Sequence, residues 1–386
     1  MKQFLRHLIF PVLLVVLIPI FATCVLCYTF QDGIIHSAPF GIIDEDNSAL
    51  SRTLVQNLAN NDTFDVVFYG DTAEELEAQI AQNHIVAGMV IPKDFSKDVA
   101  AGNSPSILLV YDGCQMSVVG ISKVKLTEVL TTLRVAASIQ ILEGKLDLQP
   151  QEALLYAQPI SNTFRYLGNP EKSLRNYVVP GAIANIVQLT MYMFLVEAIR
   201  KEEDEKVHPL LYCLLGSLLA TAVLLCCVWL MHHGFGLPMQ GAWSTIALLA
   251  FFNMFGIGNL AAILRLLLPD KLKVLAVQAA VVVMAMLLFS GYTFPALGMP
   301  PLFQAIARAI PFTYFAIPLR DVMLLGSSTA LVIGDIHWLF LFAAFTAIPV
   351  IPLWLIYRQK QLGRKNPVKQ LAEPTPQPEQ EVPPVC

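Results

Sequence analysis

The chain has 386 residues and a formal net charge of −4. Hydrophobic residues make up 55% of it and charged residues only 14%, whereas a soluble domain carries about 25% charged residues. This composition indicates that lipid is the solvent for much of the chain. The small negative charge gives no reason to expect nucleic acid as a partner.

Six stretches meet or approach the roughly 20 apolar residues that a helix needs to cross the hydrocarbon core. They are residues 8–28, 177–199, 210–231, 243–268, 274–292 and 336–357. The first follows Lys2 and Arg6 and has some features of a signal peptide. Its apolar part is longer than the apolar region of such a peptide, and no clean cleavage site follows. We therefore expect an uncleaved membrane anchor.

Lysine and arginine in the short flanking segments indicate the orientation of the spans. The N-terminus, residues 200–208 and 269–273, and the tail after residue 357 contain them, whereas the loop 232–241 has none. The sequence therefore predicts a multi-pass protein of the cell membrane, plasma or inner, with both termini cytoplasmic. An even number of spans requires the same arrangement of the termini.

Residues 31–176 have the composition of a soluble α/β domain, and the orientation of the spans places this domain outside the cytoplasm. Strand-like and helical segments alternate along it, which predicts a small, mostly parallel or mixed sheet. The expected strands are residues 40–43, 65–69, 85–91 and 106–111. Cys114 is the only cysteine of the domain, so an internal disulfide is excluded.

An acidic run after the first expected strand is the candidate metal site of this domain. Asp44, Glu45 and Asp46 offer carboxylates, which hard cations prefer as ligands. The calcium-loop pattern, with Gly at its sixth position and a distal Glu, is absent. A strand-end turn that caps the next helix, with Asn47 or Ser48 at the N-cap, is the simpler interpretation, and we expect no metal.

The chain lacks the signatures of several enzyme classes. No G-x-x-x-x-G-K-[ST] P-loop, no H-E-x-x-H and no G-x-S-x-G motif occurs in it. The expected spans hold almost no ionisable groups, apart from Glu197 and Arg265 near their ends. Ion-coupled transporters usually need buried acids or histidines near the midplane. We expect no catalytic residue, and an energy source must come from another subunit.

Three glycines in the expected spans are predicted to be packing sites rather than substrate sites. Gly181 lies early in the second span, and Gly256 and Gly258 lie on nearby turns of the fourth. Small residues of this kind let membrane helices approach closely.

Three stretches of the sequence resemble one protein family. The first is G-I-I-D-E-D-N-S-A-L-S-R at residues 41–52, and the second is I-P-K-D-F-S-K-D at residues 91–98 with Y-D-G at residues 111–113. The third, and the most specific, is S-G-Y-T-F-P at residues 290–295, followed by M-P-P, P-F-T-Y-F and R-D at residues 299–301, 311–315 and 320–321. With the layout of one span, an inserted domain and five spans, the chain resembles the permease subunits of ABC-2-type exporters over nearly its whole length.

The resemblance implies a mainly α membrane protein with six transmembrane helices, an inserted extracytoplasmic α/β domain, and a re-entrant helical hairpin before the last span. It also implies an ATP-driven exporter. Two permease subunits, as a homodimer or heterodimer, would sit in the lipid bilayer above two cytoplasmic ABC ATPase subunits. ATP would bind to those partner subunits, and this chain would hold no cofactor.

Two sets of functional residues follow from the resemblance. The contact with the ATPase would involve Arg200, Lys201, Glu202, Glu203, Asp204, Lys271 and Lys273. The hairpin, residues 294–326, would close the path near the outer face, with gate residues Phe294, Pro295, Met299, Pro300, Pro301, Pro311, Tyr314 and Arg320. The many prolines of this segment favour the hairpin independently, because irregular backbone at membrane depth survives only where protein buries it or where it lines a cavity.

The expected organisation is a first transmembrane helix in residues 1–30, the α/β domain in 31–176, a five-helix transmembrane domain in 177–358, and a disordered cytoplasmic tail in 359–386. Two other functions fit the layout. One is a membrane scaffold or phage-receptor-like protein with an extracytoplasmic binding domain, and the other is a membrane enzyme. An ATPase that co-purifies with the chain would distinguish the exporter from both. The apolar spans suit a lipidic or amphipathic cargo, but lipid-facing helices have the same composition.

Overall fold

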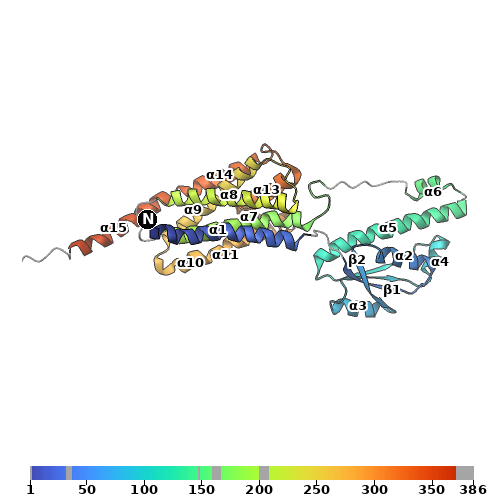
Figure 1. The fold of residues 1–386 in the computed structure, drawn as a ribbon. Helices are drawn as coiled ribbons and strands as arrows, with labels where there is room; N and C mark the ends of the chain where they lie inside the picture. Colours follow the sequence, from blue (N-terminus) through green and yellow to red (C-terminus); the bar gives the residue numbers. More distant parts are fainter. Residues whose placement is uncertain (1, 32–36, 147, 159–166, 200–207, 371–386) are drawn as a thin grey trace, which may run out of the picture. The chain divides into compact units, whose positions relative to one another are not determined.

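The computed structural model describes residues 2–31, 37–146, 148–158, 167–199 and 208–370 (Figure 1). Contacts divide the chain into two compact units. One, the helical unit, comprises Met1–Gly33 with Tyr166–Cys386, and the other, the α/β unit, comprises Ile34–Arg165. Each unit has its own apolar core, as expected of parts that fold around separate cores.

Most helices of the helical unit coincide with the predicted spans. Five stretches in the described part of the chain are long and apolar enough to cross a membrane. They lie in α1 (Lys2–Thr29), α7 (Leu174–Ala198), α8 (Pro209–Phe235), α9 (Trp243–Leu267) and the consecutive helices α14 (Ile333–Ala347) and α15 (Val350–Gln370). Figure 1 shows α1, α7, α8 and α9 running side by side. The chain is therefore mainly helical, with several helices suited to a bilayer.

The predicted span at residues 274–292 is shorter in the structure. A 3-10 turn, η1 (Asp270–Leu272), precedes α10 (Lys273–Gln278) and α11 (Ala280–Phe289), which together form a short apolar helix. Gly291, with a φ of +83°, turns the chain away after α11, a conformation that glycine adopts at little cost. A further candidate span is the pair α12 (Pro301–Ala309) and α13 (Thr313–Leu325), bent by 79°. The described helices thus provide five candidate spans, or six if the bent pair counts as one.

The helix α15 continues to Gln370, although composition predicts disorder from residue 359. The apolar start of α15 already supplies a helical nucleus, and adding residues to an existing helix is easier than starting one. Glutamine, lysine, leucine and arginine dominate its next two turns, and all four are good helix formers. Residues 371–386 lie outside the described part of the chain.

The three predicted packing glycines all lie against side chains of other elements. A Cβ atom on Gly181 would lie 2.3 Å from the Tyr292 ring, and one on Gly256 would lie 2.3 Å from the Phe342 ring. A Cβ atom on Gly258 would lie 3.0 Å from the Leu195 side chain. The prediction that these glycines are packing sites is confirmed.

The α/β unit is built on a small mixed sheet, as the alternating pattern predicts. Its strands are β1 (Ala38–Asp44), β2 (Phe64–Gly70), β3 (Ala87–Ile91) and β4 (Leu108–Tyr111), in the order β2-β1-β3-β4. The first three are parallel, and β4 runs antiparallel to β3.

Helices cover both faces of this sheet (Figure 1). One face packs on α2 (Ala49–Ala59), α4 (Phe95–Ala101) and the long α5 (Met116–Leu146), and the other packs on α3 (Ala73–Ala81). A short helix, α6 (Pro150–Ala157), contacts α5. Side chains of β1 alternate between the faces: Phe40 and Ile42 belong to the first core and Ile43 to the second, as the two-residue period of a strand requires.

The acidic run after β1 is a helix-capping turn. The Asp44 carboxylate accepts hydrogen bonds from the backbone N–H groups of Asp46 and Asn47, at 3.1 and 3.0 Å, and from the Ser51 hydroxyl at 2.7 Å. Ser48 is the N-cap of α2 and forms a capping box with Ser51. The Asp46 carboxylate accepts from the Ser96 N–H at 3.1 Å, so the first two family-like stretches of the sequence meet at this point.

Replacement of Asp44 by alanine should loosen the α/β unit locally. It leaves the Asp46 and Asn47 N–H groups without their acceptor and removes the shorter contact of the Ser51 hydroxyl, which costs about 1–2 kcal/mol. Hydrogen exchange of the full-length protein should be faster in β1 and α2, and unchanged in α7. The matched control is Asp65→Ala, since Asp65 is an exposed acid on β2. Equal effects of the two substitutions would contradict the capping role of Asp44.

Candidate functional site

The residues predicted to contact an ATPase fall in two places. Arg200 and Lys201, with Glu202, Glu203 and Asp204, lie outside the described residues, in the segment 200–207 between α7 and α8. Lys271 lies in η1, and Lys273 is the first residue of α10. For Arg200 to Asp204, the structure therefore describes only the flanking ends of α7 and α8.

Two contacts join the end of α7 to α10. The Lys273 ammonium forms an ion pair with the Glu197 carboxylate, and the Tyr192 hydroxyl donates to the Ala276 carbonyl oxygen at 2.8 Å. Both ion-pair partners are partly exposed, and pairs of that kind contribute about 0–1 kcal/mol. The ion pair therefore positions the start of α10 beside the end of α7 more than it stabilises the fold.

The other end of segment 200–207 is held by His208. Its Nδ1 accepts the Leu210 N–H at 3.2 Å and so caps α8. Its ring lies 4.5 Å from the Trp354 ring of α15, and the Arg358 guanidinium lies over the same tryptophan. Burial lowers the pKa of His208, which favours the neutral ring that the cap requires.

The predicted gate residues separate into an exposed and a packed group. Phe294, Pro295, Pro300 and Pro301 are exposed and Met299 is half-buried, in the connection that leads through η2 (Ala296–Gly298) into α12. Pro311 is buried in the bend between α12 and α13, and Tyr314 and Arg320 are half-buried on α13. Only the second group packs against neighbouring helices.

The 79° bend between α12 and α13 has a local cause. The residue before a proline is driven out of the helical region, and Ile310, which precedes Pro311, is extended with φ −78° and ψ 123°. The Thr313 hydroxyl lies 2.7 Å from the Ala307 carbonyl oxygen and 3.0 Å from that of Ser290. Tyr314 stacks on Trp338 of α14 with 4.1 Å between ring centroids. These contacts hold the bend against the end of α11 and against α14.

Arg320 belongs to a cluster that joins three elements. Its guanidinium carbon lies 4.5 Å from the ring centroid of Tyr177 on α7 and 4.7 Å from that of Tyr292, which follows α11. Its Nη1 donates to the Tyr292 carbonyl oxygen at 3.4 Å. A cation in contact with two aromatic rings is favourable by about 0.5–2 kcal/mol per ring. We call these three residues the tyrosine–arginine cluster.

The Tyr292 hydroxyl also enters the backbone of α7. It accepts the Gly181 N–H at 2.9 Å and donates to the Tyr177 carbonyl oxygen at 2.7 Å, the two groups that one helical turn would pair. Pro180, just before Gly181, lacks an N–H and disturbs this turn. Tyr292 is fully buried, so its hydroxyl makes both contacts inside the helical unit. The Tyr292 side chain therefore satisfies the backbone of α7 at the turn that Pro180 disturbs.

Removal of this hydroxyl should destabilise the helical unit. Tyr292→Phe keeps the ring but leaves Gly181 N–H and Tyr177 C=O without this partner, which costs about 1–3 kcal/mol. Thermal unfolding of the purified protein in detergent should show a lower Tm. Tyr314→Phe is the matched control, because its hydroxyl bonds the Arg308 carbonyl oxygen in an exposed setting. A Tm for Tyr292→Phe equal to that of Tyr314→Phe would contradict the backbone role of Tyr292.

Sequence reasoning missed a set of buried amides in α7 and α9. The Asn253 amide donates to the Gln188 side-chain oxygen at 2.6 Å, and Asn185 donates to the Met284 carbonyl oxygen at 3.1 Å. Asn259 donates to the Ala343 carbonyl oxygen at 3.1 Å. Single amides within an apolar span are the signal that identifies such contacts, since membrane helices use them across their interfaces. The side-chain oxygens of the three asparagines have no hydrogen-bond partner among the described residues.

Neither unit offers a metal site within its described residues. No group of three or more His, Cys, Asp or Glu side chains there lies close enough to hold an ion. The carboxylates of Asp44 and Asp46 bond to backbone and hydroxyl groups instead.

The apolar helices and the broken helix pair define a multi-pass membrane protein, whose apolar helical core contains a few buried amides. Residues 8–351 match the family model described as ABC-2 family transporter protein, so the chain belongs to this family. Over 337 residues it is 20% identical to the protein described as "Probable multidrug ABC transporter permease YbhS" of Escherichia coli strain K12, with 82% of this chain and 83% of that protein covered. The same protein of Escherichia coli O157:H7 matches equally well. No solved structure matches the chain significantly.

Family membership confirms the resemblance inferred from the sequence. The chain is an ABC transporter permease of the ABC-2 family and not itself the ATPase. The family also implies a membrane location and an ATPase partner. It favours the permease over the scaffold and enzyme alternatives.

Proposed function

We propose that the chain is the transmembrane permease subunit of an ABC exporter, which moves its substrate outward using ATP hydrolysed by a separate cytoplasmic ATPase. The observation that carries this proposal is the family match across residues 8–351. The sequence has no P-loop, so ATP binds to the partner subunit and this chain needs no cofactor. The similarity to a multidrug permease supports a hydrophobic or amphipathic substrate.

In this proposal both termini are cytoplasmic and the α/β unit lies outside the cytoplasm. The distribution of lysine and arginine supports this orientation. A second permease subunit, identical or related, completes the path through the bilayer. The buried amides of α7 and α9 include Asn185, Asn253 and Asn259, whose side-chain oxygens have no partner among the described residues. These oxygens give the helical interior acceptors to which a passing substrate can hydrogen-bond.

Coupling to the ATPase is assigned to segment 200–207 together with Lys271 and Lys273. The contacts on either side of the segment support this assignment. Glu197 ties the end of α7 to Lys273, and His208 ties the start of α8 to Trp354 of α15. Force that the ATPase applies to this segment is therefore transmitted to α7, α8, α10 and α15 together.

The gate is assigned to the bent pair α12 and α13 within residues 294–326, as a re-entrant hairpin near the outer face. Its polar backbone at the bend is covered by protein, with Pro311 and Phe312 buried, as irregular backbone at membrane depth requires. The tyrosine–arginine cluster connects α13 to α7. Movement of α7 during coupling is thereby passed to the gate.

Purification of the tagged chain from its native membrane should bring down an ATPase subunit with a P-loop. Inside-out vesicles that contain this complex should accumulate a lipophilic fluorescent dye when ATP is added, because outward export in the cell is inward transport in such vesicles. The control is the complex with the P-loop lysine of the ATPase replaced by alanine. An absence of both the ATPase and ATP-dependent accumulation would contradict the exporter function.

Replacement of residues 200–206 by a Gly/Ser linker of equal length should abolish dye accumulation while the protein still inserts and remains folded. The linker removes the side chains that would contact the ATPase but keeps the connection between α7 and α8. Transport by vesicles and the amount of purified protein are measured in parallel. Equal replacement of residues 371–377 is the control. Full transport by the 200–206 variant would contradict the coupling assignment.

A further inference from the structure

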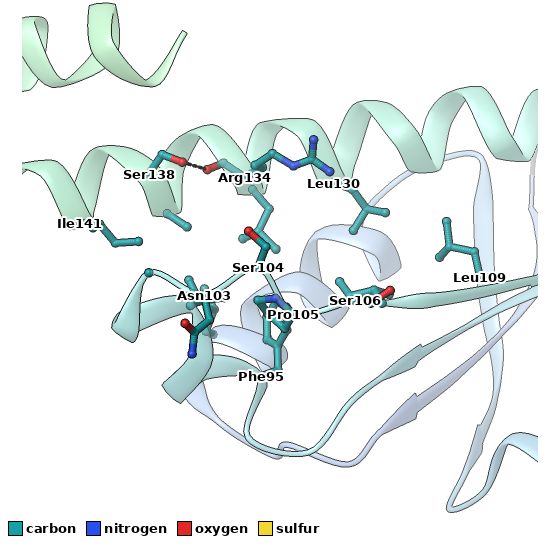
Figure 2. Close-up of a pocket in the computed structure, with 16 residues that line it drawn as sticks. Phe95, Asn103, Ser104, Pro105, Ser106, Leu109, Leu130, Arg134, Ser138 and Ile141 are labelled. Atoms are coloured by element: carbon teal, nitrogen blue, oxygen red, sulfur yellow. Dashed lines mark hydrogen bonds between the residues drawn. The ribbon is translucent and has the colours of Figure 1, made fainter.

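The α/β unit contains a pocket to which the proposed function assigns no role. It has a volume of about 710 Å³ and is lined by residues of α2, α4, α5 and the segment 102–107 that leads to β4. Figure 2 shows one wall along α5, with Leu130, Arg134, Ser138 and Ile141, and the other along this segment, with Asn103, Ser104, Pro105 and Ser106. Pockets that hold small molecules have volumes of about 300–1,000 Å³.

The pocket exists because the apolar stripe of α5 is longer than the core it covers. Leu126 lies in the core of the sheet, and Leu130 and Leu133 pack against that core. Ala137 and Ile141 continue the stripe at helical spacing and line the pocket instead. At this level the opposite wall consists of small residues, which do not fill the space. Apolar surface is thus left open on one side of the unit.

The lining indicates the chemistry of a ligand. Apolar side chains line the pocket on two sides, with Leu50, Phe95 and Val99 on one side and the α5 stripe on the other, and polar groups make up the rest of its surface. Arg134 is the only charged residue among those that line the pocket, and within the described residues no acid forms an ion pair with it. It is exposed on α5, where Figure 2 shows its side chain extended along the helix. A ligand with an apolar body between the walls would place a negative group beside this guanidinium.

We propose that this pocket binds a single-chain amphipathic anion, such as a long-chain carboxylate, taken up from water. The apolar chain lies between α5 and segment 102–107, and the carboxylate pairs with Arg134. The hydroxyls of Ser104 and Ser106 provide further hydrogen-bond partners at the rim. Binding needs neither ATP nor transport, so the proposal stands independently of the exporter function.

The test uses the full-length protein in phosphatidylcholine nanodiscs and a hexadecanoic acid with a photoreactive diazirine in its chain. After irradiation, mass spectrometry of peptides should locate adducts in residues 130–141 and 102–109. Unlabelled hexadecanoic acid should compete better than its methyl ester by about 2- to 5-fold, the advantage expected of one exposed ion pair. Adducts confined to the helices of the helical unit would overturn the proposal.

Variants separate the pocket from the charge. Ala137→Trp fills the pocket from α5, and Ser104→Trp fills it from the exposed opposite wall. Each substitution should reduce labelling at least about tenfold, which corresponds to a loss of roughly 1.4 kcal/mol of binding free energy. Ala136→Trp, on the exposed side of α5, is the matched control and should label normally. Normal labelling of both pocket variants would overturn the site.

Arg134→Gln should remove the preference for the acid over the ester while labelling by the ester is retained. Arg52→Gln, a change of an exposed arginine on α2 that does not line the pocket, is the control and should keep the preference. Discs of phosphatidylglycerol should give the same labelling as phosphatidylcholine discs, because the ligand comes from water. Persistence of the preference in Arg134→Gln would overturn the assignment of the anion, and loss of labelling in phosphatidylglycerol would overturn its single-chain source.

Discussion

The helical unit depends on one hydroxyl group. Tyr292 inserts its hydroxyl between Gly181 N–H and Tyr177 C=O, and it thereby allows α7 to cross an apolar environment despite Pro180. The same ring leaves no space for a side chain at position 181. The carbonyl oxygen of Tyr292 accepts hydrogen bonds from Arg320 and from the Tyr177 hydroxyl. In a bilayer, unpaired backbone groups cost several kcal/mol each, so the position of α13 relative to α7 follows from the need to satisfy α7.

The two units rely on different physics. In the α/β unit, short polar side chains at strand ends satisfy nearby N–H groups, and apolar burial on two sheet faces supplies the stability. In the helical unit, burial of apolar surface contributes little free energy to the packing of one helix on another, because the lipid that a helix would otherwise contact is itself apolar. Close approach at Gly256 and Gly258, and amide contacts such as that of Asn253 with Gln188, select the helix pairs instead. The family-like stretches in residues 41–52 and 91–98 serve the first kind of stability, since Asp46 and Ser96 join them.

Features with a local cause were predictable from the sequence. Apolar runs located most of the spans, strand-like runs that alternate with helical segments located the strands, and the pairing of Asp44 with a helix start was inferred from the turn that it occupies. Features that depend on distant partners were not predictable. Nothing near Tyr292 indicates that its hydroxyl completes a helix more than a hundred residues earlier, although Pro180 followed by Gly181 indicates that α7 is interrupted. The predicted span 274–292 is slightly longer than the α10–α11 helix, and residues 359–370, expected to be disordered, are helical. Hydropathy and composition do not register where a helix breaks or how far it extends. The charged residues proposed for coupling, from Arg200 to Asp204, lie outside the described part and stay predictions.

The separation between Gly181 and Tyr292 has a consequence for how the protein is made. The two residues are 111 positions apart, and a ribosome adds about 5–20 residues per second. The α7 segment is therefore synthesised roughly 5–20 s before the tyrosine that completes its backbone. During that interval the insertion machinery handles an α7 whose interrupted turn has no partner, and the final shape of this helix is set only when the chain after α11 arrives. Completion of α7 is thus a late step in the assembly of the membrane part, which a truncation before residue 292 would never reach.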